Sequence, residues 1–405
     1  MIFRTEYFKL LRQFIDKEQI KVITGIRRCG KSSLLRLLKD ELLAKDKTSD
    51  QILFINFESF KFSEIQTAKA LYNFVEKKIH PEQKTYLLLD EIQNVHQWEK
   101  AVNSFKVDFD VDIYITGSNS QLLSSELASH LAGRYVEIPM FTLSFKEYLS
   151  FREEYFEHSA NAISTNFKNY LRLGGFPVIH TVNYDKETAY QVIKDIYSSI
   201  ILKDTLQRHK IRNVELLERV VKYAFDNVGN TFSGKNVADY FKSQQRKVDI
   251  NTIYNYFTYL EGAFILYRVP RYDIKGKEIL KTQEKFYVSD ISLIYSVFGF
   301  RDRMISGILE NIVFLELKRR GFEVYVGKQG NKEIDFIAEK KQNIIYIQVS
   351  YKLESQETID REFSSLLSIN DQFPKYVISM DDFFEDSIEG IQHLHISDFL
   401  LKDEL

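Results

Sequence analysis

The sequence predicts an α/β protein whose N-terminal part is a parallel β-sheet with helices on both faces. Over residues 1–143, short apolar runs rich in β-branched residues alternate with amphipathic stretches of helical period. Two of these runs, Leu87 to Leu89 and Ile113 to Ile115, are apolar at every position. Strands that are covered on both faces have this composition because neither side meets water. We therefore expect both runs in the middle of the sheet.

The rest of the chain changes pattern three times, which predicts three further parts. Residues 144–210 show mainly helical periodicity, and we interpret them as a helical lid. Residues 211–300 contain three amphipathic helical stretches and then two strands, an order typical of a winged-helix domain. Residues 301–405 begin a second α/β pattern. Its expected elements are a helix over 305–320, the strands FEVYVG, EIDFIAE and IIYIQVSY, a helix near 358–367 and the strand KYVIS.

The composition excludes several classes of protein. The 405 residues carry 55 Lys and Arg against 57 Asp and Glu, so the net charge of -2 gives no overall attraction to nucleic acid or to an anionic membrane. A single cysteine excludes an internal disulfide framework. The N-terminus lacks an export signal, and the apolar runs are far shorter than the ~20 residues that span a bilayer. We expect a soluble, cytoplasmic protein with no membrane partner.

Residues Gly25 to Ser32 form a glycine-rich motif between a predicted strand and a predicted helix. The motif reads Gly, four residues, Gly-Lys-Ser, which is the phosphate-loop (P-loop) pattern. Its glycines let successive backbone N–H groups turn toward phosphate oxygens, and the helix N-terminus adds its dipole. Lys31 is expected to contact the β- and γ-phosphates, and Ser32 the Mg²⁺ ion. The sequence thus predicts ATP or ADP and Mg²⁺ as ligands, with the binding residues Gly25, Arg27, Arg28, Cys29, Gly30, Lys31, Ser32 and Ser33.

Two neighbouring carboxylates follow the apolar strand YLLLDE. Asp90 comes at the carboxyl end of this strand, the edge of an open α/β sheet at which ligands bind. We expect Asp90 to hold Mg²⁺ through water. Glu91 is the expected catalytic residue that orients and polarises the attacking water, because phosphoryl transfer depends mainly on positioning and charge stabilisation.

Three further residues near this motif have two interpretations each. Asn119 follows the strand VDIYIT and is either a sensor of the γ-phosphate or an ordinary turn residue. Arg134 is either an arginine finger that reaches the γ-phosphate of a neighbouring subunit or a surface arginine. Cys29 either has a pKa lowered by the helix N-terminus or fills a variable position of the loop.

Six motifs together resemble those of bacterial and archaeal AAA+-like ATPases with a C-terminal domain of unknown function: GIRRCGKS, INFES, YLLLDEIQNV, ITGSNSQLL, LAGRY and LGGFP. The resemblance covers most of the chain and implies an additional-strand ATPase whose catalytic glutamate, here Glu91, follows the Mg²⁺ aspartate. It also implies a winged-helix segment and a region similar to the PD-(D/E)xK restriction-endonuclease fold, here FYVSDISL, EIDFIAE and YIQVSY. The expected domains are a P-loop ATPase core (1–143), a helical lid (144–210), a winged-helix domain (211–300) and a restriction-endonuclease-like α/β domain (301–405).

A basic region accompanies the predicted wing. The second helix of a winged helix would expose Asn251, Thr252 and Asn255 to base edges or phosphates of DNA. The wing carries Arg268, Arg271, Lys275, Lys277, Lys281 and Lys285 against Asp273, Glu278 and Glu284. This local surplus of positive charge is either a DNA contact, a set of solvated lysines or a surface that docks a protein.

A second set of metal-ligand candidates lies in the endonuclease-like part. The candidates are Glu310 on a helix, Asp335 on one strand and Gln348 on the next. Their oxygens suit a hard divalent cation beside a scissile phosphate. Active nucleases of this fold carry a lysine two residues after the last acid, where this chain has Ser350. Lys352, two residues farther along the same strand face, is a candidate substitute, and Glu333 is either a further ligand or a surface acid. The loss of one carboxylate together with the usual lysine favours a degenerate module that only binds, and a cleaving site is the alternative.

These features support three hypotheses about function. The first is an ATP-hydrolysing motor or switch that associates with DNA. The second is a regulatory switch in which nucleotide state controls binding of a protein partner, and the third is an ATP-dependent DNA nuclease. A homo-oligomer is compatible with each of them.

Overall fold

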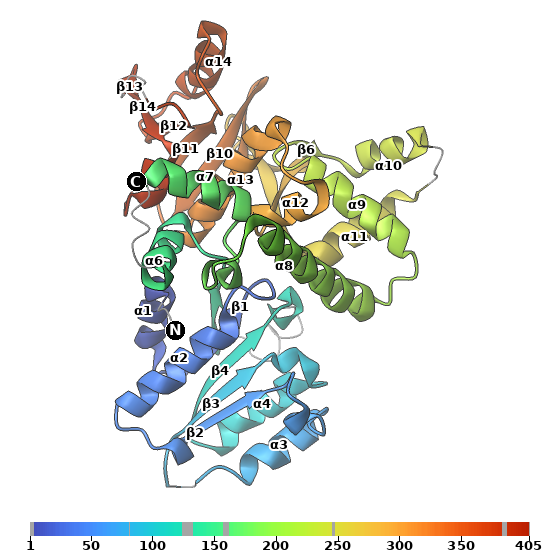
Figure 1. The fold of residues 1–405 in the computed structure, drawn as a ribbon, viewed down its shortest axis with the longest axis vertical. Coiled ribbons are helices and arrows are strands. Elements are labelled where there is room, and N and C mark those ends of the chain that lie inside the picture. The colour runs from blue at the N-terminus through green and yellow to red at the C-terminus, as the bar shows by residue number, and fades with distance from the viewer. Residues whose placement is uncertain are drawn as a thin grey trace. The chain divides into compact units, whose positions relative to one another are not determined.

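The computed structural model describes residues 4–80, 82–123, 133–156, 162–244, 248–382 and 387–404. Within these ranges the chain forms two compact units. Unit 1 comprises the residues up to Thr142 together with 262–264, and unit 2 comprises 143–261 and 265–405. Each unit contains its own β-sheet (Figure 1). The predicted α/β class is confirmed.

The sheet of unit 1 is parallel and has five strands in the order β2-β3-β4-β1-β5. The strands are β1 (Ile20–Thr24), β2 (Ile52–Asn56), β3 (Thr85–Asp90), β4 (Val111–Gly117) and β5 (Tyr135–Pro139). Strands β3 and β4 are neighbours inside the sheet and are buried along their whole length. The expectation that their apolar runs form central strands is therefore confirmed.

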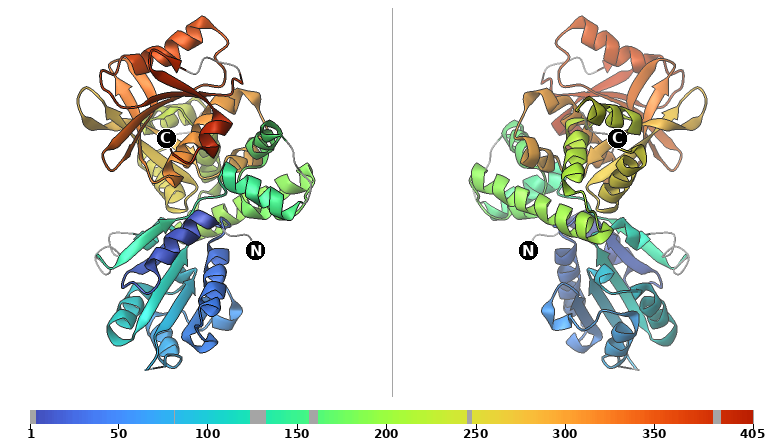
Figure 2. Two further views of the ribbon diagram at one scale, coloured as in Figure 1. Left: turned by 90° about the vertical axis from the view of Figure 1, so that its left-hand side faces the viewer. Right: turned by 90° about the vertical axis from the view of Figure 1, so that its right-hand side faces the viewer.

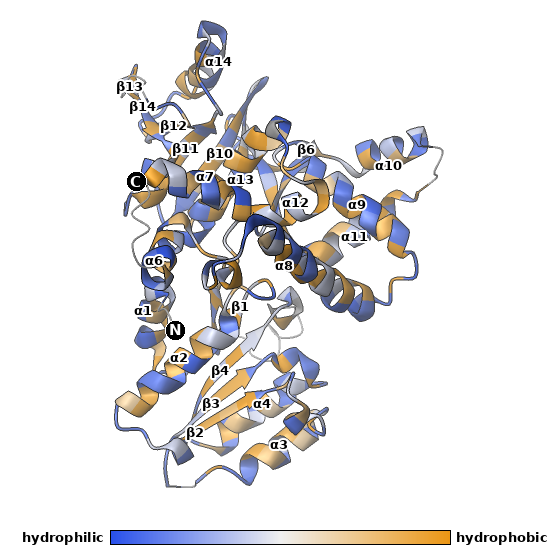
Figure 3. Cartoon of the chain, in the orientation of Figure 1, coloured by the Kyte–Doolittle hydropathy of each residue, from blue (hydrophilic) through white to orange (hydrophobic). Residues whose placement is uncertain are grey.

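Helices cover both faces of this sheet (Figures 1 and 2). Helices α1 (Thr5–Phe14) and α2 (Lys31–Ala44) lie on one face, and α3 (Ala68–Glu76) and α4 (Trp98–Asp108) lie on the other. Alternate residues of the central strands pack on the second pair of helices in one core cluster, because side chains alternate across a strand. Figure 3 shows β2, β3 and β4 as predominantly hydrophobic. The residues of this core include Leu87, Leu89, Ile113 and Ile115 of the strands and Leu71, Val75, Val102 and Phe105 of the helices.

A buried ion pair joins β1 to β4 inside unit 1. The Lys21 Nζ donates to Asp112 Oδ1 and, at 2.9 Å, to the Lys17 carbonyl oxygen. The Asp112 Oδ2 accepts hydrogen bonds from the Asp16 backbone N–H at 2.8 Å and from the Tyr114 hydroxyl at 3.0 Å. Burial lowers the pKa of Lys21, although Asp112 opposes that shift. Both charged groups therefore depend on each other inside the core.

The nine strands of unit 2 form one sheet in the order β13-β14-β12-β11-β10-β9-β7-β8-β6. The strands are β6 (Thr231–Phe232), β7 (Leu266–Asp273), β8 (Glu278–Val288), β9 (Glu323–Gln329), β10 (Lys332–Lys340), β11 (Asn343–Val349), β12 (Lys375–Ser379), β13 (Ser387–Ile388) and β14 (Ile391–His395). The predicted strands of residues 301–405 are confirmed in β9 to β12. Strand β7 pairs in parallel with β9, so the predicted wing and the predicted endonuclease-like part share one sheet. The four-part division of the chain stays a prediction.

The helices of unit 2 after residue 143 are α6 (Phe145–Tyr155), α7 (Ile163–Leu173), α8 (Lys186–Ser199), α9 (Val214–Asp226), α10 (Gly234–Ser243), α11 (Ile250–Gly262), α12 (Ile291–Phe298), α13 (Ile305–Arg319), α14 (Gln356–Leu367) and α15 (Ile396–Leu401). All lie in stretches that the sequence predicts to be helical, except α12 and α15, which were not predicted. A π-helix over Ile200–Gln207 continues α8, where the sequence predicts a single long helix. Within the described ranges, no helix is both long enough and apolar enough to cross a bilayer.

We predict that Lys21→Met destabilises unit 1 by about 3–5 kcal/mol, because the change leaves the buried Asp112 side chain without its cation. Urea unfolding of the full chain, followed by Trp98 fluorescence within unit 1, measures the effect. Lys17→Met is the matched control, since the Lys17 side chain is exposed and its carbonyl oxygen is unchanged by the substitution. Equal midpoints for the two variants would contradict the prediction.

Candidate nucleotide site

The P-loop connects the end of β1 to the start of α2. Gly25 has φ 146°, and a Cβ atom there would lie 2.0 Å from the Met140 carbonyl oxygen. Gly30 precedes the first residue of α2 and has φ 111°. Both positions therefore need glycine, because other residues adopt such backbone angles at a cost in strain. The backbone of the loop is therefore compatible with the cradle that the motif predicts.

The Arg4 side chain holds the P-loop in place through hydrogen bonds to backbone carbonyl oxygens. Its side chain is buried, and its guanidinium donates to the Cys29 carbonyl oxygen at 3.0 Å. It also donates to the Phe141 carbonyl oxygen at 2.6 Å and the Thr142 carbonyl oxygen at 3.2 Å. One side chain thus ties the P-loop to the segment after β5. Arg4 was not predicted, because nothing near it in the sequence indicates where a lone arginine will lie.

The predicted residues of the loop lie around the start of α2. The Lys31 Nζ donates to the carbonyl oxygens of Gly25 at 3.0 Å and Ile26 at 3.2 Å. Arg27 pairs with Glu58 at 2.7 Å, and Arg28 has a positive φ of 69°. Ser33 is half-buried in the first turn of α2.

Cys29 differs from one of its two interpretations. Its thiol is fully buried, and burial raises its pKa. The suggestion that the helix N-terminus lowers this pKa is wrong, because the loss of water around the thiol outweighs the nearby positive charges of Lys31 and Arg4. Cys29 occupies a buried loop position.

Asp90 meets Ser32 as the sequence predicts. The Ser32 hydroxyl donates to Asp90 Oδ1 at 3.0 Å, and the Thr116 hydroxyl donates to the same oxygen at 2.6 Å. The Asn56 amide donates to Asp90 Oδ2 at 2.7 Å. Burial raises the pKa of Asp90, while the hydroxyls of Thr116 and Ser32 oppose that shift. Asn56 ends β2 and Thr116 lies on β4, so both strands beside β3 help to orient this carboxylate.

Glu91 lies one residue beyond β3 with left-handed backbone angles, φ 56° and ψ 48°. Its backbone N–H donates to the Thr116 hydroxyl at 2.9 Å, and its carboxylate accepts hydrogen bonds from Gln93 and, at 3.1 Å, from the Ser118 hydroxyl. Its Oε1 is 3.6 Å from the Lys31 Nζ. Burial alone would raise the pKa of Glu91, but attraction to Lys31 and the Gln93 hydrogen bond outweigh it and lower the pKa. Glu91 is therefore a charged, buried carboxylate beside the P-loop lysine.

The structure separates the two remaining candidates. Asn119 is buried just after β4, at the same edge of the sheet as Asp90 and Glu91. Arg134 comes directly before β5, and Tyr135 of β5 pairs with Ile20 at the start of β1. Arg134 thus lies at the sheet edge opposite the P-loop of its own chain, where it donates to the Asn103 side chain at 3.0 Å. Its role toward a neighbouring subunit stays a prediction.

The assembled residues fit Mg-ATP. The loop leaves no room for a Cβ at Gly25, and it leads into the N-terminus of α2 at Gly30. Helix N-termini of this kind are suited to bind phosphate groups. Hydroxyl and carboxylate oxygens, here Ser32 and Asp90, are the donors that Mg²⁺ prefers. Ser32 and Asp90 are the ligands that the sequence predicts. Asn56, Thr116 and Ser118, which hydrogen-bond to Asp90 or Glu91, were not predicted. The polar ends of the neighbouring strands were the available signal for them.

The second predicted site is organised around a lysine. The carboxylates of Glu310 and Asp335 lie within 3.3 Å of the Lys285 Nζ. Burial, reinforced by Asp335, raises the pKa of Glu310, while the ammonium of Lys285 and the hydroxyl of Tyr287 oppose that shift. Gln348 contributes differently from the prediction, since its Oε1 accepts the Asp335 backbone N–H at 3.2 Å. Lys352 pairs with Glu354 at 2.6 Å and stays exposed.

The basic surplus of the predicted wing is smaller than the sequence suggests. Lys285 is buried rather than exposed. Arg268 pairs with Glu261 at 2.7 Å and with Glu284 at 3.4 Å. Arg271 is 3.6 Å from a Glu333 oxygen. These three cations are therefore largely neutralised. Lys275 and Lys277 are exposed, and the side chain of Lys281 lies outside the described residues.

We predict that Thr116→Val raises by about 10-fold the Mg²⁺ concentration needed to saturate binding of a fluorescent ATP analogue. The substitution keeps the shape of the side chain and removes the hydroxyl that orients both Asp90 and the Glu91 backbone. Thr85→Val is the matched control, because Thr85 begins β3 at the other edge of the sheet. An unchanged Mg²⁺ dependence would mean that Thr116 does not position the metal carboxylate.

Comparisons with known proteins agree with this geometry. Residues 17–149 match the AAA domain family, and residues 164–303 match a domain of unknown function. Neither description names a winged helix or an endonuclease fold, so these two assignments stay predictions. Among solved structures, the Walker-type ATPase of Pyrococcus abyssi has the same fold, with a TM-score of 0.55 at 15% identity over 74% of this chain and 96% of that one.

Two relatives match nearly the whole chain. An uncharacterized protein of Methanocaldococcus jannaschii is 29% identical over 394 residues, which cover 93% of this chain and 86% of the relative. An uncharacterized protein of Haemophilus influenzae is 38% identical over 403 residues, which cover 99% of both chains. The chain therefore belongs to the family of this Haemophilus influenzae protein, and it carries a match to the AAA domain family over residues 17–149.

Proposed function

We propose that unit 1 binds Mg-ATP and hydrolyses it to ADP and phosphate. The observation that carries this proposal is the meeting of Ser32 and Asp90 beneath the P-loop, with Glu91 beside Lys31. These four side chains come from the two strand ends that the P-loop pattern requires. A buried acid that stays charged next to the loop lysine suits the polarisation of water.

Each residue has a separate task in this mechanism. The backbone N–H groups from Gly25 to Gly30 bind phosphate oxygens, and Lys31 leaves the loop carbonyls to neutralise charge on the β- and γ-phosphates. Ser32 and Asp90 would hold Mg²⁺, which supplies charge stabilisation at the phosphates. Glu91 accepts a hydrogen bond from the attacking water and orients it in line with the bond that breaks. Asn119 is proposed to contact the γ-phosphate.

We predict different effects for two substitutions in this site. Lys31→Ala removes the cation that contacts the phosphates and should weaken ATP binding at least about 10-fold. Glu91→Gln keeps the side chain's shape and its hydrogen bonds but loses its charge, so ATP binding should persist while kcat falls about 100-fold or more. Calorimetry with ATP and a phosphate-release assay measure the two quantities.

Exposed residues provide the controls for these two variants. Lys45→Ala and Glu64→Gln alter residues of the same types outside the site and should leave both quantities unchanged. Hydrolysis by Glu91→Gln at the rate of the unmodified protein would exclude Glu91 as the residue that orients water. Loss of ATP binding in that variant would assign it a structural role instead.

Association with DNA is proposed as the second component of the function. The element order α9, β6, α10, α11, β7, β8, with β6 paired to β8, supports a winged helix in residues 211–300. Its second helix in the predicted pair, α11, exposes Asn251 and Asn255, whereas Thr252 is half-buried. Two exposed lysines of the β7–β8 turn, Lys275 and Lys277, add local positive charge.

We predict that duplex DNA raises the ATPase rate and that the double variant Lys275→Ala, Lys277→Ala weakens DNA binding equally for all sequences. The slope of log K against log salt should fall by about 2, because each lysine that contacts a phosphate contributes about 1. Fluorescence anisotropy over a salt series measures this slope. The control Lys186→Ala, Lys194→Ala changes two exposed lysines of α8.

An ATPase rate that no form of DNA changes would favour the other hypothesis, nucleotide-controlled binding of a protein partner.

A homo-oligomer is proposed for the ATP-bound state, in which Arg134 would act on a neighbouring subunit. The cytoplasm is the proposed location of the protein.

A further inference from the structure

Lys285 of β8 lies at the centre of three carboxylates in unit 2. Its Nζ is 2.9 Å from Glu333 Oε1, 3.1 Å from Glu310 Oε2 and 3.3 Å from Asp335 Oδ1. The lysine side chain is 3% exposed. Carboxylate oxygens that converge in this way are also the ligands that divalent cations such as Mg²⁺ take in proteins. Here the positive charge at their centre is the end of a side chain.

Two further oxygens of the predicted metal site already accept hydrogen bonds from backbone N–H groups. Asp335 Oδ2 accepts the Val349 backbone N–H at 2.9 Å, and Gln348 Oε1 accepts the Asp335 backbone N–H at 3.2 Å. Both bonds lie where β10 departs from regular pairing with β9, between Ile334 and Ile337. In the part of the chain that the structure describes, no set of three His, Cys, Asp or Glu side chains is arranged to hold a metal ion.

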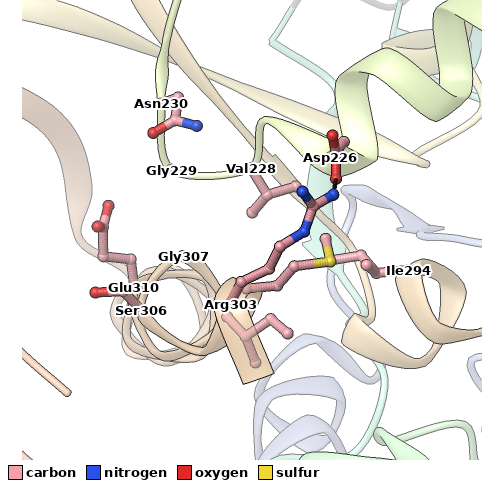
Figure 4. A pocket seen from close by; sticks show the side chains of 11 residues that line it. Asp226, Val228, Gly229, Asn230, Ile294, Arg303, Ser306, Gly307 and Glu310 are labelled. Carbon is pink, nitrogen blue, oxygen red and sulfur yellow. Dashed lines mark hydrogen bonds and ion pairs between the residues drawn. The ribbon is translucent and has the colours of Figure 1, made fainter. Parts of the chain in front are cut away.

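Solvent reaches the carboxylates around Lys285. Burial of these acids therefore does not explain why a lysine, and not a metal ion, lies between them. Glu310 lines a pocket of about 350 Å³ at the first turn of α13, where Figure 4 shows it beside Gly307 and across from Gly229. A Cβ at Gly307 would lie 2.4 Å from the Val228 carbonyl oxygen, so the loop before β6 approaches the helix closely. The Glu333 side chain is 34% exposed. Ions in solution can therefore approach two of the three acids.

We infer that the Lys285 ammonium takes the place of a divalent cation in this cluster, so that unit 2 contains a metal-independent ion-pair centre and the predicted ligands Glu310, Asp335 and Gln348 do not load with Mg²⁺. A metal ion at the centre would need oxygens at about 2.0–2.6 Å and would lie against a like charge buried within about 3 Å. The tethered ammonium meets the same acids without the entropy cost of capturing an ion. Arg271, 3.6 Å from Glu333, adds a second positive charge.

Mn²⁺ binding to the full chain tests this inference. All proteins carry Asp90→Asn and are studied without nucleotide, so that the P-loop site does not contribute. Titration followed by electron paramagnetic resonance should find no ion bound at this cluster up to about 1 mM Mn²⁺, the range in which weak carboxylate sites fill. Lys285→Met should bind one Mn²⁺ per chain, and adding Asp335→Asn should abolish that binding. Lys332→Met, at an exposed lysine of β10, should bind none.

One result would overturn the inference directly. If the chain with Lys285 intact binds one equivalent of Mn²⁺, and Asp335→Asn removes it, then the cluster is a metal site and Lys285 is a neighbour of the metal. Such a result would return the nuclease hypothesis to consideration. Plasmid cleavage that requires both Mn²⁺ and Asp335 would lead to the same conclusion.

Thermal unfolding tests the ion pairs even if Lys285→Met folds poorly. Lys285→Met leaves the three acids without the ammonium that pairs with them, so this variant should melt well below the parent protein. Binding of Mn²⁺ should then raise the Tm of the variant. The double variant Lys285→Met, Glu310→Gln removes one acid together with the lysine and should melt closer to the parent. A double variant that melts no higher than Lys285→Met would contradict a centre held by charge balance.

Discussion

Asp90 has both carboxylate oxygens engaged by side chains from three neighbouring elements, and the rest of unit 1 depends on that convergence. Ser32 comes from the first turn of α2, Asn56 from the end of β2 and Thr116 from β4. The three elements reach one point only if strands β2, β3 and β4 are parallel and in register, so that their carboxyl ends meet at one edge. The covered faces of the sheet maintain this register through the continuous apolar core.

In both units, buried lysine side chains are paired with carboxylates of opposite charge. Lys21 and Asp112 neutralise each other in the core of unit 1, and Lys285 is surrounded by acids in unit 2. Lys31 and Glu91 form a third pair, separated by 3.6 Å, which is looser than the other two. A loose pair suits the proposed nucleotide site, in which Lys31 would exchange protein oxygens for phosphate oxygens. The tight, enclosed pairs suit positions at which nothing is exchanged, because a buried charge without its partner is costly.

The sequence allowed the parallel sheet, the P-loop and the two acids after β3 to be predicted, because each of these signals is local. Gly25 to Ser32 are contiguous, and Asp90 and Glu91 directly follow a run of apolar residues. Lys285 could not be assigned in the same way. It precedes Asp335 by 50 residues and belongs to a strand that the pattern suggested was an exposed wing. Arg4 likewise contacts carbonyl oxygens from distant parts of the chain. Because every residue has a backbone carbonyl group, the sequence does not indicate which of them an arginine will contact. Charge counting failed at the wing for the same physical reason, since pairing with Glu261 and Glu284 depends on tertiary contacts.

The nine-stranded sheet of unit 2 has a mechanical consequence. Parallel pairing joins Arg271, Tyr272 and Asp273 of β7 to Val326, Gly327 and Lys328 of β9, so backbone hydrogen bonds connect the hairpin of the predicted winged helix to the C-terminal strands. Rotation of one about the other would require this ladder to break. Any displacement of the hairpin must therefore also displace the C-terminal strands, so the two would move together as one rigid body.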